Sequence, residues 1–382
     1  MKDNSKLKST FHALLLALFL APISAFAEWG LNMRQGVTPI SQEIYDMHMV
    51  TLWVVTIIGI IVFGVMFWSI FHHRKSKGIK AAKFSHSTTA EIIWTLIPFV
   101  IITSLAIPAT KLLIKMEDTG EANITVKATG SQWKWKYDYL EEGITIYSAL
   151  DENSVKVSQR DSGLDPMQLE NYLLEVDEPI VLPINTKIRI LTTSNDVLHA
   201  WWVPDLGWKR DAVPGFINDN WAVIEKPGTY RGQCVELCGK GHGYMPIVVK
   251  AVPMDEYTAW VAAKKLAQAA AKNTSDMVLS MEELMIKGES IYKAQCLVCH
   301  QAGGKGIRGA FPALAKSPMA TKSERRLEHI QQIIYGKNLM PAFGEQLSDV
   351  DIAAITTYER NAWGNDTGDI IQAKEVAEAR SK

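Results

Sequence analysis

Two long apolar runs constrain this chain more than any other feature of its sequence. Met49–Phe71 contains 23 residues without a charged side chain, and Ile92–Thr110 contains 19. Because about 20 apolar residues in a helix cross a hydrocarbon core about 30 Å thick, we predict membrane-spanning helices at about 49–71 and 92–114. Tryptophans near the ends of both runs are typical of the membrane–water interface.

The segment between the two runs predicts their orientation. Residues 72–83 contain five Lys/Arg and no acidic residue. By the positive-inside rule this loop is cytoplasmic, so the chain before the first helix and everything after the second lie outside. The predicted hairpin, with its flanks, covers residues 28–120.

Residues 1–27 are predicted to be a signal peptide. Three lysines precede the apolar stretch Ala13–Leu20, and Ala25-Phe-Ala27 provides a cleavage site of the small-x-small type. The alternative, a third membrane helix, is disfavoured because the apolar stretch is too short to span comfortably.

Residues 121–253 are predicted to form an all-β sandwich with antiparallel strands. Six short segments are rich in β-branched and aromatic residues, namely 124–129, 134–139, 180–182, 187–191, 221–224 and 247–252. Turn signals such as Lys226-Pro-Gly-Thr229 separate them, which predicts six or seven strands. Residues 151–165 are polar without a pattern, and we expect a surface insertion there.

The rest of the chain divides by composition. Residues 254–280 are rich in Ala and Lys and are expected to form a helix and a linker. A separate all-α domain is expected at 281–366, followed by a polar tail at 367–382. The chain of 382 residues exceeds one typical domain, and its net charge of −1 offers no basic surplus for binding nucleic acid.

Four soft or borderline metal ligands lie within twelve residues of the β region: Cys234, Cys238, His242 and Met245. Their spacing would suit one face of a helix, but three alternating glycines among them oppose a helix, because each costs about 1 kcal/mol there. A loop lets the side chains converge on one point instead. Thiolate and thioether ligands favour copper, and an axial Met beside His and Cys is typical of electron-transfer copper sites.

Two cysteines in one loop suggest two copper ions bridged by both sulfurs. Such a pair needs a second imidazole from elsewhere in the chain. His199, in Asp196–Trp202 at the end of a strand-like run, is the best candidate.

This constellation resembles the binuclear copper (CuA) site of subunit II of the haem–copper cytochrome c oxidases. The resemblance implies the ligands His199, Cys234, Cys238, His242, Met245 and the backbone carbonyl of Glu236. It also implies a cupredoxin-like form of the sandwich, and a Mg²⁺ ligated by the Glu236 side chain at the contact with subunit I. The two-helix hairpin before a large exported domain is also that family's layout.

A second motif is Cys296-Leu-Val-Cys299-His300, the attachment signature of c-type haem. Two thiols form thioethers with the haem, and the adjacent imidazole ligates the iron. A zinc or redox site would need further cysteines, and the two sites together use all four cysteines of the chain. No pair is left for a structural disulfide.

The haem iron needs a second axial ligand, commonly Met. Met340 is favoured because its loop precedes a predicted helix start at Ser348–Asp351 and matches the Met-Pro of small bacterial cytochromes c; Met319 is the alternative. Three further segments resemble that family: Phe311-Pro312 behind the haem histidine, and Ser290–Gln295 and Ile352–Tyr358 in two flanking helices.

The family resemblance assigns roles to other residues. Trp133 matches the exposed aromatic through which electrons arrive from cytochrome c, although a sheet Trp is more often part of the core. Asp138 and Asp196 would supply acidic docking charge or be ordinary solvated acids. Glu91 matches a carboxylate at the mouth of a proton path. It also fits a capping box with Thr88, and both roles are compatible.

The two resemblances, at about 28–270 and 281–366, together match subunit II of caa3-type oxidases. They imply an electron-input subunit in the bacterial inner (plasma) membrane, with copper and haem domains on the periplasmic side. Electrons from a soluble or membrane-bound cytochrome c, or from the chain's own haem c, would pass through CuA to subunit I, which reduces oxygen to water and pumps protons. Subunit III is a further expected partner.

Four other functions share some of these motifs. A membrane-anchored CuA and haem c carrier serving another reductase remains open. A copper chaperone with Cys-x3-Cys would need neither His242 nor Met245. Nitrous-oxide reductases carry the copper motif after a large His-rich propeller that this sequence lacks, and quinol-oxidase relatives lack the copper ligands.

Overall fold

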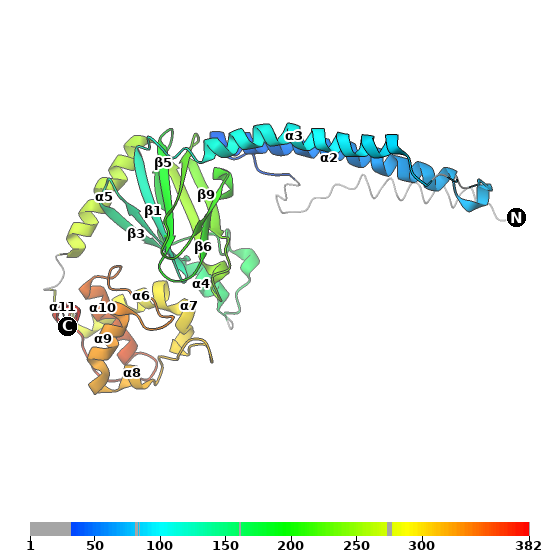
Figure 1. Cartoon of the computed structure of the whole chain (residues 1–382). Helices are drawn as coiled ribbons and strands as arrows, with labels where there is room; N and C mark the ends of the chain where they lie inside the picture. Colours follow the sequence, from blue (N-terminus) through cyan, green and yellow to red (C-terminus); the bar gives the residue numbers. More distant parts are fainter. Residues whose placement is uncertain (1–31, 81–82, 84, 160–161, 273–276, 382) are drawn as a thin grey trace. The chain divides into compact units, whose positions relative to one another are not determined.

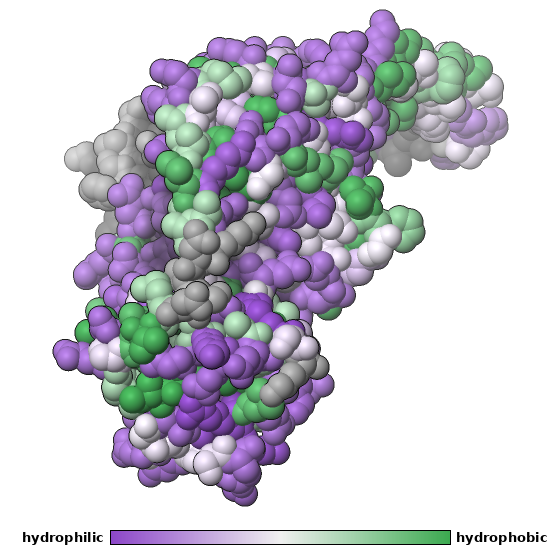
Figure 2. Space-filling view, turned by 90° about the vertical axis from the view of Figure 1, so that its left-hand side faces the viewer, coloured by the Kyte–Doolittle hydropathy of each residue, from purple (hydrophilic) through white to green (hydrophobic). Residues whose placement is uncertain are grey.

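The fold is taken from a computed structural model that describes residues 32–80, 83, 85–159, 162–272 and 277–381. The predicted signal peptide at 1–27 lies outside these residues. Along the chain come a pair of long apolar helices, a β-sandwich and a helical C-terminal region (Figure 1). Over the globular parts, the face shown in Figure 2 is mainly hydrophilic.

The apolar pair consists of α2 (Pro39–His72) and α3 (Thr88–Met116), which contact each other; a short turn, η1 (Lys75–Lys77), follows α2. Both helices are long and apolar enough to cross a membrane. Their large apolar side chains are exposed, as a lipid-facing surface requires. Both predicted spans lie inside the observed helices.

Each helix begins earlier than predicted. Thr38 caps α2: its side chain accepts a hydrogen bond from the Ser41 amide, the Ser41 hydroxyl oxygen accepts one from the Thr38 amide, and a proline occupies the first helical position. The N-cap of α3 is Ser87, whose hydroxyl oxygen accepts from the Ala90 amide. The predicted capping box of Thr88 and Glu91 is therefore wrong, because the cap lies one residue earlier. Glu91 stays in the first turn, where an acid suits the helix dipole.

The sandwich has two five-stranded sheets, with strand orders β3-β2-β1-β5-β8 and β4-β10-β9-β6-β7. The strands are β1 (Ile124–Ser131), β2 (Lys134–Tyr139), β3 (Ile144–Ser148), β4 (Ile180–Pro183), β5 (Lys187–Ser194), β6 (His199–Trp202), β7 (Lys209–Ala212), β8 (Asn218–Val223), β9 (Gly228–Cys234) and β10 (Pro246–Val252). Alternate residues, among them Val126, Tyr137 and Ile190, point into a shared core.

Two pairings differ from the predicted antiparallel arrangement, because β1 pairs with β5 and β4 with β10 in parallel. Four strands were also missed: β3, β6, β7 and β9. Polar residues and glycines dominate β7 and β9, so these strands owe their extended form to sheet pairing rather than to a local β pattern.

The predicted insertion at 151–165 is not patternless. It contains α4 (Glu152–Ser158), where the Asp151 carboxylate accepts hydrogen bonds from two backbone amides and Val155 is buried. The capping acid and a single inward apolar residue are enough for two helical turns.

After β10 the chain is helical. Its helices are α5 (Met254–Lys272), α6 (Met281–Ile291), a π-helical turn (Tyr292–Cys296), α7 (Leu297–His300), α8 (Pro318–Thr321), α9 (Arg326–Tyr335), α10 (Asp349–Asn361) and α11 (Ala373–Arg380). Two short 3-10 turns lie among these helices, η6 (Ala302–Gly304) and η7 (Ser323–Arg325). Three others lie earlier, in the region of the sandwich: η2 (Pro166–Gln168), η3 (Pro204–Leu206) and η4 (His242–Tyr244).

Two features organise this helical region. Helices α6 and α10 pack closely at Gly288, where a Cβ would lie 2.3 Å from the Ala354 carbonyl oxygen. The predicted helix start at Ser348 is confirmed, with a capping box to Asp351. The predicted polar tail is wrong, because α11 buries Val376 and Ala379 in the core of this region.

Candidate copper and haem centres

Strand pairing brings the copper ligands together. Cys234 ends β9 and Met245 immediately precedes β10, and these two strands form an antiparallel hairpin. The amide of Cys234 donates to the Met245 carbonyl at 3.2 Å. His199 starts β6, whose Trp201 pairs with Cys234. The loop between β9 and β10 carries the other two side chains, Cys238 and His242.

The six predicted copper ligands converge on one small volume. The Cys234 and Cys238 sulfurs are 3.9 Å apart. Cys234 Sγ lies 3.8 Å from His199 Nδ1 and 3.3 Å from the Glu236 carbonyl oxygen. Cys238 Sγ lies 3.6 Å from His242 Nδ1 and 3.5 Å from Met245 Sδ. Since a metal–thiolate bond is about 2.3 Å, one ion can reach both sulfurs, and the donor set fits a copper pair.

His199 is held by Asp196, a carboxylate that was predicted to supply docking charge or to be an ordinary solvated acid. Its ring is fully buried, and Nε2 lies 2.9 Å from Asp196 Oδ1. The carboxylate fixes the proton on Nε2 and leaves Nδ1 facing Cys234, which is the usual arrangement around a metal-binding imidazole. The spacing of three residues between an acid and the histidine was the signal that could have revealed it.

The metal-free site holds protons that a metal must displace. Burial alone would lower the pKa of His199, but hydrogen bonds to Asp196 and Cys234 outweigh it and raise that pKa to about 9. The hydrogen bond from Cys238 lowers the pKa of Cys234 to about 3, and the resulting thiolate raises the pKa of Cys238. Copper binding must therefore release protons from His199 and Cys238.

Trp133, between β1 and β2, packs against the copper loop, which is the loop between β9 and β10 that carries Cys238 and His242. Its indole Nε1 donates to the Cys238 carbonyl at 3.1 Å, and the Gln132 side-chain amide donates to the same oxygen at 2.8 Å. A Cβ at Gly241 would lie 2.2 Å from the Trp133 ring, so only glycine permits this contact. The half-buried ring is thus tied to the backbone of a predicted ligand.

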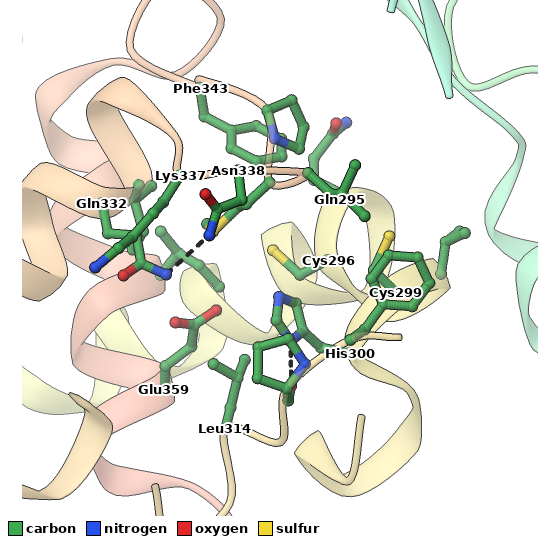
Figure 3. Close-up of a pocket in the computed structure, with 18 of the residues that line it drawn as sticks. Gln295, Cys296, Cys299, His300, Leu314, Gln332, Lys337, Asn338, Phe343 and Glu359 are labelled. Atoms are coloured by element: carbon green, nitrogen blue, oxygen red, sulfur yellow. Dashed lines mark hydrogen bonds between the residues drawn. The ribbon is translucent and has the colours of Figure 1, made fainter. Parts of the chain in front are cut away.

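The haem motif borders a hollow. A cavity of about 620 Å³ has a lining that includes Cys296, Cys299, His300, Met340 and apolar side chains such as Leu314 (Figure 3). His300 Nδ1 lies 2.9 Å from the Pro312 carbonyl, which leaves Nε2 for iron. Burial raises the pKa of Cys299 to about 11, so its free thiol is neutral. A mostly apolar cavity with two thiols and one available imidazole fits haem c.

Both candidate axial methionines line this cavity. Met340 Sδ accepts a hydrogen bond from Gln332 at 3.5 Å, and its loop is closed by backbone hydrogen bonds to Lys337. Met319 lies on α8, and its carbonyl accepts from Arg360. These hydrogen bonds hold Met340 at the cavity.

Asp138 is engaged by neighbours on the sheet. It accepts a hydrogen bond from Thr145 at 2.7 Å and pairs with Lys127 and Lys136. An acid already neutralised in this way adds little docking charge.

Three further residues at these sites were not predicted from the sequence. They are Gln132, beside the copper loop, and the buried pair His329 and Glu359 in the cavity lining.

Three family models match the chain. They are "Cytochrome C oxidase subunit II, transmembrane domain" at residues 27–112, "Cytochrome C oxidase subunit II, periplasmic domain" at 124–252, and "Cytochrome C oxidase, cbb3-type, subunit III" at 283–358. Cytochrome c oxidase subunit 2 of Arabidopsis thaliana is 37% identical over 250 residues, which are 65% of this chain and 95% of the relative.

The chain belongs to the cytochrome c oxidase subunit II family. The mitochondrial cytochrome c oxidase subunit 2 of Glycine max is 39% identical over 64% of this chain, and the match spans 61% of that relative's length. The crystal structure of the periplasmic domain of subunit II of cytochrome oxidase of Bradyrhizobium japonicum is 36% identical, covers 39% of this chain and 98% of its own, and gives a TM-score of 0.34.

Family membership confirms several expectations. The chain is a membrane-anchored part of an oxidoreductase complex and works with other oxidase subunits. The subunit II domain implies a CuA copper centre, and the cytochrome domain implies haem c. The predicted order of a two-helix hairpin, a cupredoxin-like sandwich and a helical cytochrome c domain is confirmed.

Proposed function

We propose that this subunit is the electron-input subunit of a terminal cytochrome c oxidase. The convergence of two thiols, two imidazoles, a thioether and a carbonyl, in a chain that also holds a haem-sized cavity, carries this proposal. The copper pair and the haem, when bound, supply one-electron storage. The chain's own residues hold these groups and connect them to each other and to the donor.

In this proposal the copper ligands have distinct roles. Cys234 and Cys238 would hold both ions, His199 and His242 would each hold one, and Met245 and the Glu236 carbonyl would complete the donor set. Three of these residues lie at the ends of β6, β9 and β10 or next to them. A scaffold of paired strands holds the ligands in one geometry for both oxidation states, which suits rapid electron transfer.

We assign Trp133 as the residue through which electrons arrive at the copper pair. The hydrogen bond from its indole to the Cys238 carbonyl joins the ring to a bridging ligand. The half-buried ring leaves part of its surface for a soluble or membrane-bound cytochrome c. The Met340 sulfur and His300 are assigned as the axial ligands of haem c, with Cys296 and Cys299 as its thioether anchors.

The remaining assignments concern the membrane, the partner subunits and two acidic residues, Glu236 and Glu91. The copper and haem domains are assigned to the periplasmic face of a bacterial inner membrane, and the basic loop after α2 supports this orientation. The partners are subunit I, where oxygen is reduced and protons are pumped, and subunit III. The Glu236 side chain contributes a ligand to a shared Mg²⁺, and Glu91 lies at the mouth of a proton path.

Metal analysis and spectroscopy of the purified complex test this function. We expect two coppers and one covalent haem c per chain, and an electron-spin signal shared equally over two copper nuclei. A four-line signal from a single copper would contradict the binuclear assignment. A large haem-containing subunit should co-purify; if the chain purifies alone and reduces another enzyme, it is a free-standing carrier.

A further inference from the structure

A buried hydrogen-bonded pair lies in the lining of the haem cavity and has no part in the function described so far. His329 Nε2 on α9 and Glu359 Oε2 on α10 are 2.8 Å apart. Their side chains are only 3% and 5% exposed. Both residues border the cavity that Cys296 and His300 also line, and Figure 3 shows the Glu359 carboxylate on that side.

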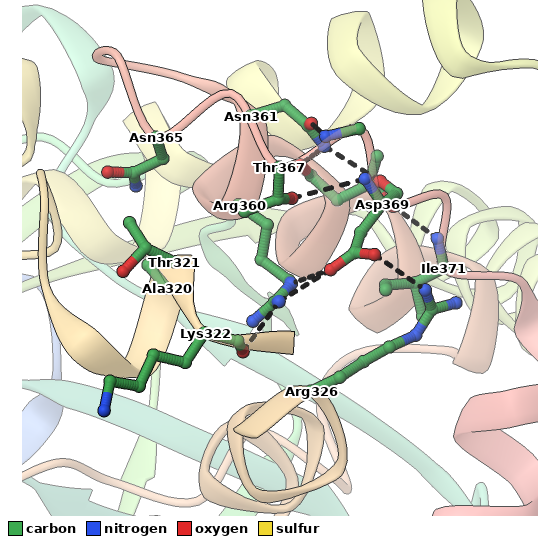
Figure 4. Close-up of polar contacts among 12 residues, drawn as sticks. Ala320, Thr321, Lys322, Arg326, Arg360, Asn361, Asn365, Thr367, Asp369 and Ile371 are labelled. Carbon is green, nitrogen blue, oxygen red and sulfur yellow. Dashed lines mark hydrogen bonds and ion pairs between the residues drawn. The ribbon is translucent and has the colours of Figure 1, made fainter. Parts of the chain in front are cut away.

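The cations nearest in sequence do not balance Glu359. Arg360 donates to Asp369 at 2.6 Å and to the Lys322 carbonyl (Figure 4). It also donates to the Met319 carbonyl at 3.1 Å. Arg325 pairs with the exposed Glu328. Within the part of the chain that the structure describes, His329 is thus the one ionisable side chain bonded to the Glu359 carboxylate.

The field of this carboxylate reaches the haem attachment site. Burial raises the pKa of Cys296 most, and the charge of Glu359 raises it further. The same two causes, in the same order, act on the pKa of Tyr292. Other titratable or charged groups on the elements around the pair are Cys299, His300, Arg325, Lys337 and Tyr358.

The second ring nitrogen of His329 is also informative. Nδ1 is buried and has no hydrogen-bond partner among the described residues. A pair that only tied α9 to α10 could be replaced by two apolar side chains without leaving a polar atom unsatisfied. A titratable pair beside a cavity for a redox group, by contrast, can exchange a proton as the charge in the cavity changes.

We propose that His329 and Glu359 form a proton-linked charge partner of the haem. The Glu359 carboxylate favours ferric iron, which carries one more positive charge than ferrous iron. When one electron from the donor reduces the iron, the pair binds up to one proton from solvent, shared between Nε2 and Oε2. When that electron leaves for the copper pair, the proton returns to solvent. This proposal rests on haem c occupying the cavity.

The reduction potential of haem c in the intact oxidase tests the proposal. We expect the potential to fall as pH rises, because proton binding by the pair favours the reduced iron. A tenfold difference in proton affinity between the two oxidation states corresponds to about 59 mV for one electron. Glu359→Gln should raise the potential and abolish its pH dependence. His329→Gln keeps a hydrogen-bond donor but cannot bind the proton, so it should lower the potential and weaken its pH dependence.

Glu328→Gln is the matched control, because Glu328 lies on the same helix but is exposed. It should leave the potential unchanged. The covalent haem band is read first, and its absence would contradict the proposed function itself. If haem is present but the wild-type potential is independent of pH, the pair only joins two helices. Where the variants fail to fold, reduced-minus-oxidised infrared spectra of the wild type decide: no carboxyl or imidazole protonation change overturns the proposal.

Discussion

The copper site and the haem site of this subunit are built in opposite ways. Around the copper site, neighbouring ligand atoms already lie within 3.9 Å of one another, on strands whose pairing does not involve the metal. The haem ligands instead border a hollow of about 620 Å³. A small ion is therefore added to a finished scaffold, whereas haem c supplies part of the core on which its own domain packs.

The largest expected effect removes the copper centre and keeps its scaffold. Cys238→Ser should abolish the mixed-valence signal completely, because a single remaining thiolate cannot bridge two ions. Cys238 is itself part of the buried core of the sandwich, so a serine hydroxyl there should lower the unfolding midpoint of the metal-free sandwich modestly without preventing folding. Lys240→Gln, at an exposed position in the same loop, is the control and should retain the signal. An unchanged signal in Cys238→Ser would remove the bridging role.

The second largest effect is expected when the haem domain is removed from the copper domain. A stop codon at position 273 should leave an assembled oxidase with a normal copper spectrum. Its oxygen uptake should depend on added cytochrome c, because a tethered haem domain acts at an effective concentration on the order of millimolar. Uptake should fall with ionic strength as charges are screened, and further with Trp133→Ala. If no soluble cytochrome reduces the truncated oxidase at low salt, Trp133 is not an independent input residue.

A smaller effect is confined to the haem iron. Met340→Ala should leave the haem attached, because the thioethers to Cys296 and Cys299 do not depend on the axial sulfur. The Met-to-iron charge-transfer band should disappear and the reduction potential should fall. Met319→Ala is the matched control, since Met319 lines the same cavity. If the band persists in Met340→Ala and is lost in Met319→Ala, the two roles are exchanged.

Copper binding should also respond to the carboxylate behind His199. Copper competes with protons at His199, whose pKa is raised to about 9, and at Cys238, whose pKa is raised as well. Affinity should therefore still rise steeply with pH above the ordinary histidine value of about 6.5. Asp196→Asn should make the rise above that value shallower, because His199 then loses its proton at lower pH, and should weaken binding by about 10–100-fold. Copper titration of the metal-free subunit at several pH values measures both. An unchanged slope would mean that Asp196 does not act on His199.

The smallest effect compares two glycines of the copper loop. Gly241→Ala should displace the Trp133 ring and slow electron delivery several-fold while copper remains bound, because the added Cβ meets the indole at 2.2 Å. Gly243→Ala should change little, since nothing lies within 4 Å of its Cβ position. Stopped-flow reduction by cytochrome c measures the rates. Equal rates in both variants would show that the position of the indole does not control electron input.

The sequence by itself determined the parts of this protein that depend on local chemistry. Long uncharged runs need no tertiary context to favour membrane helices, and the spacing of Cys, His and Met residues identified both metal-binding motifs. The helix start at Ser348 was also predictable, because a capping box is complete within four residues. The starts of α2 and α3 were placed too late, since polar caps lie outside the apolar runs that were used to find them.

Only the tertiary structure decided which distant residues meet. Pairing of β6 with β9 brings His199 to Cys234 across 35 residues, and packing of α9 against α10 joins His329 to Glu359 across 30. The parallel pairing of β1 with β5 likewise left no local trace. Register and helix packing are set by the burial of a whole core, so the contacts that orient the copper ligands and place a charge beside the haem appear only when the chain is folded.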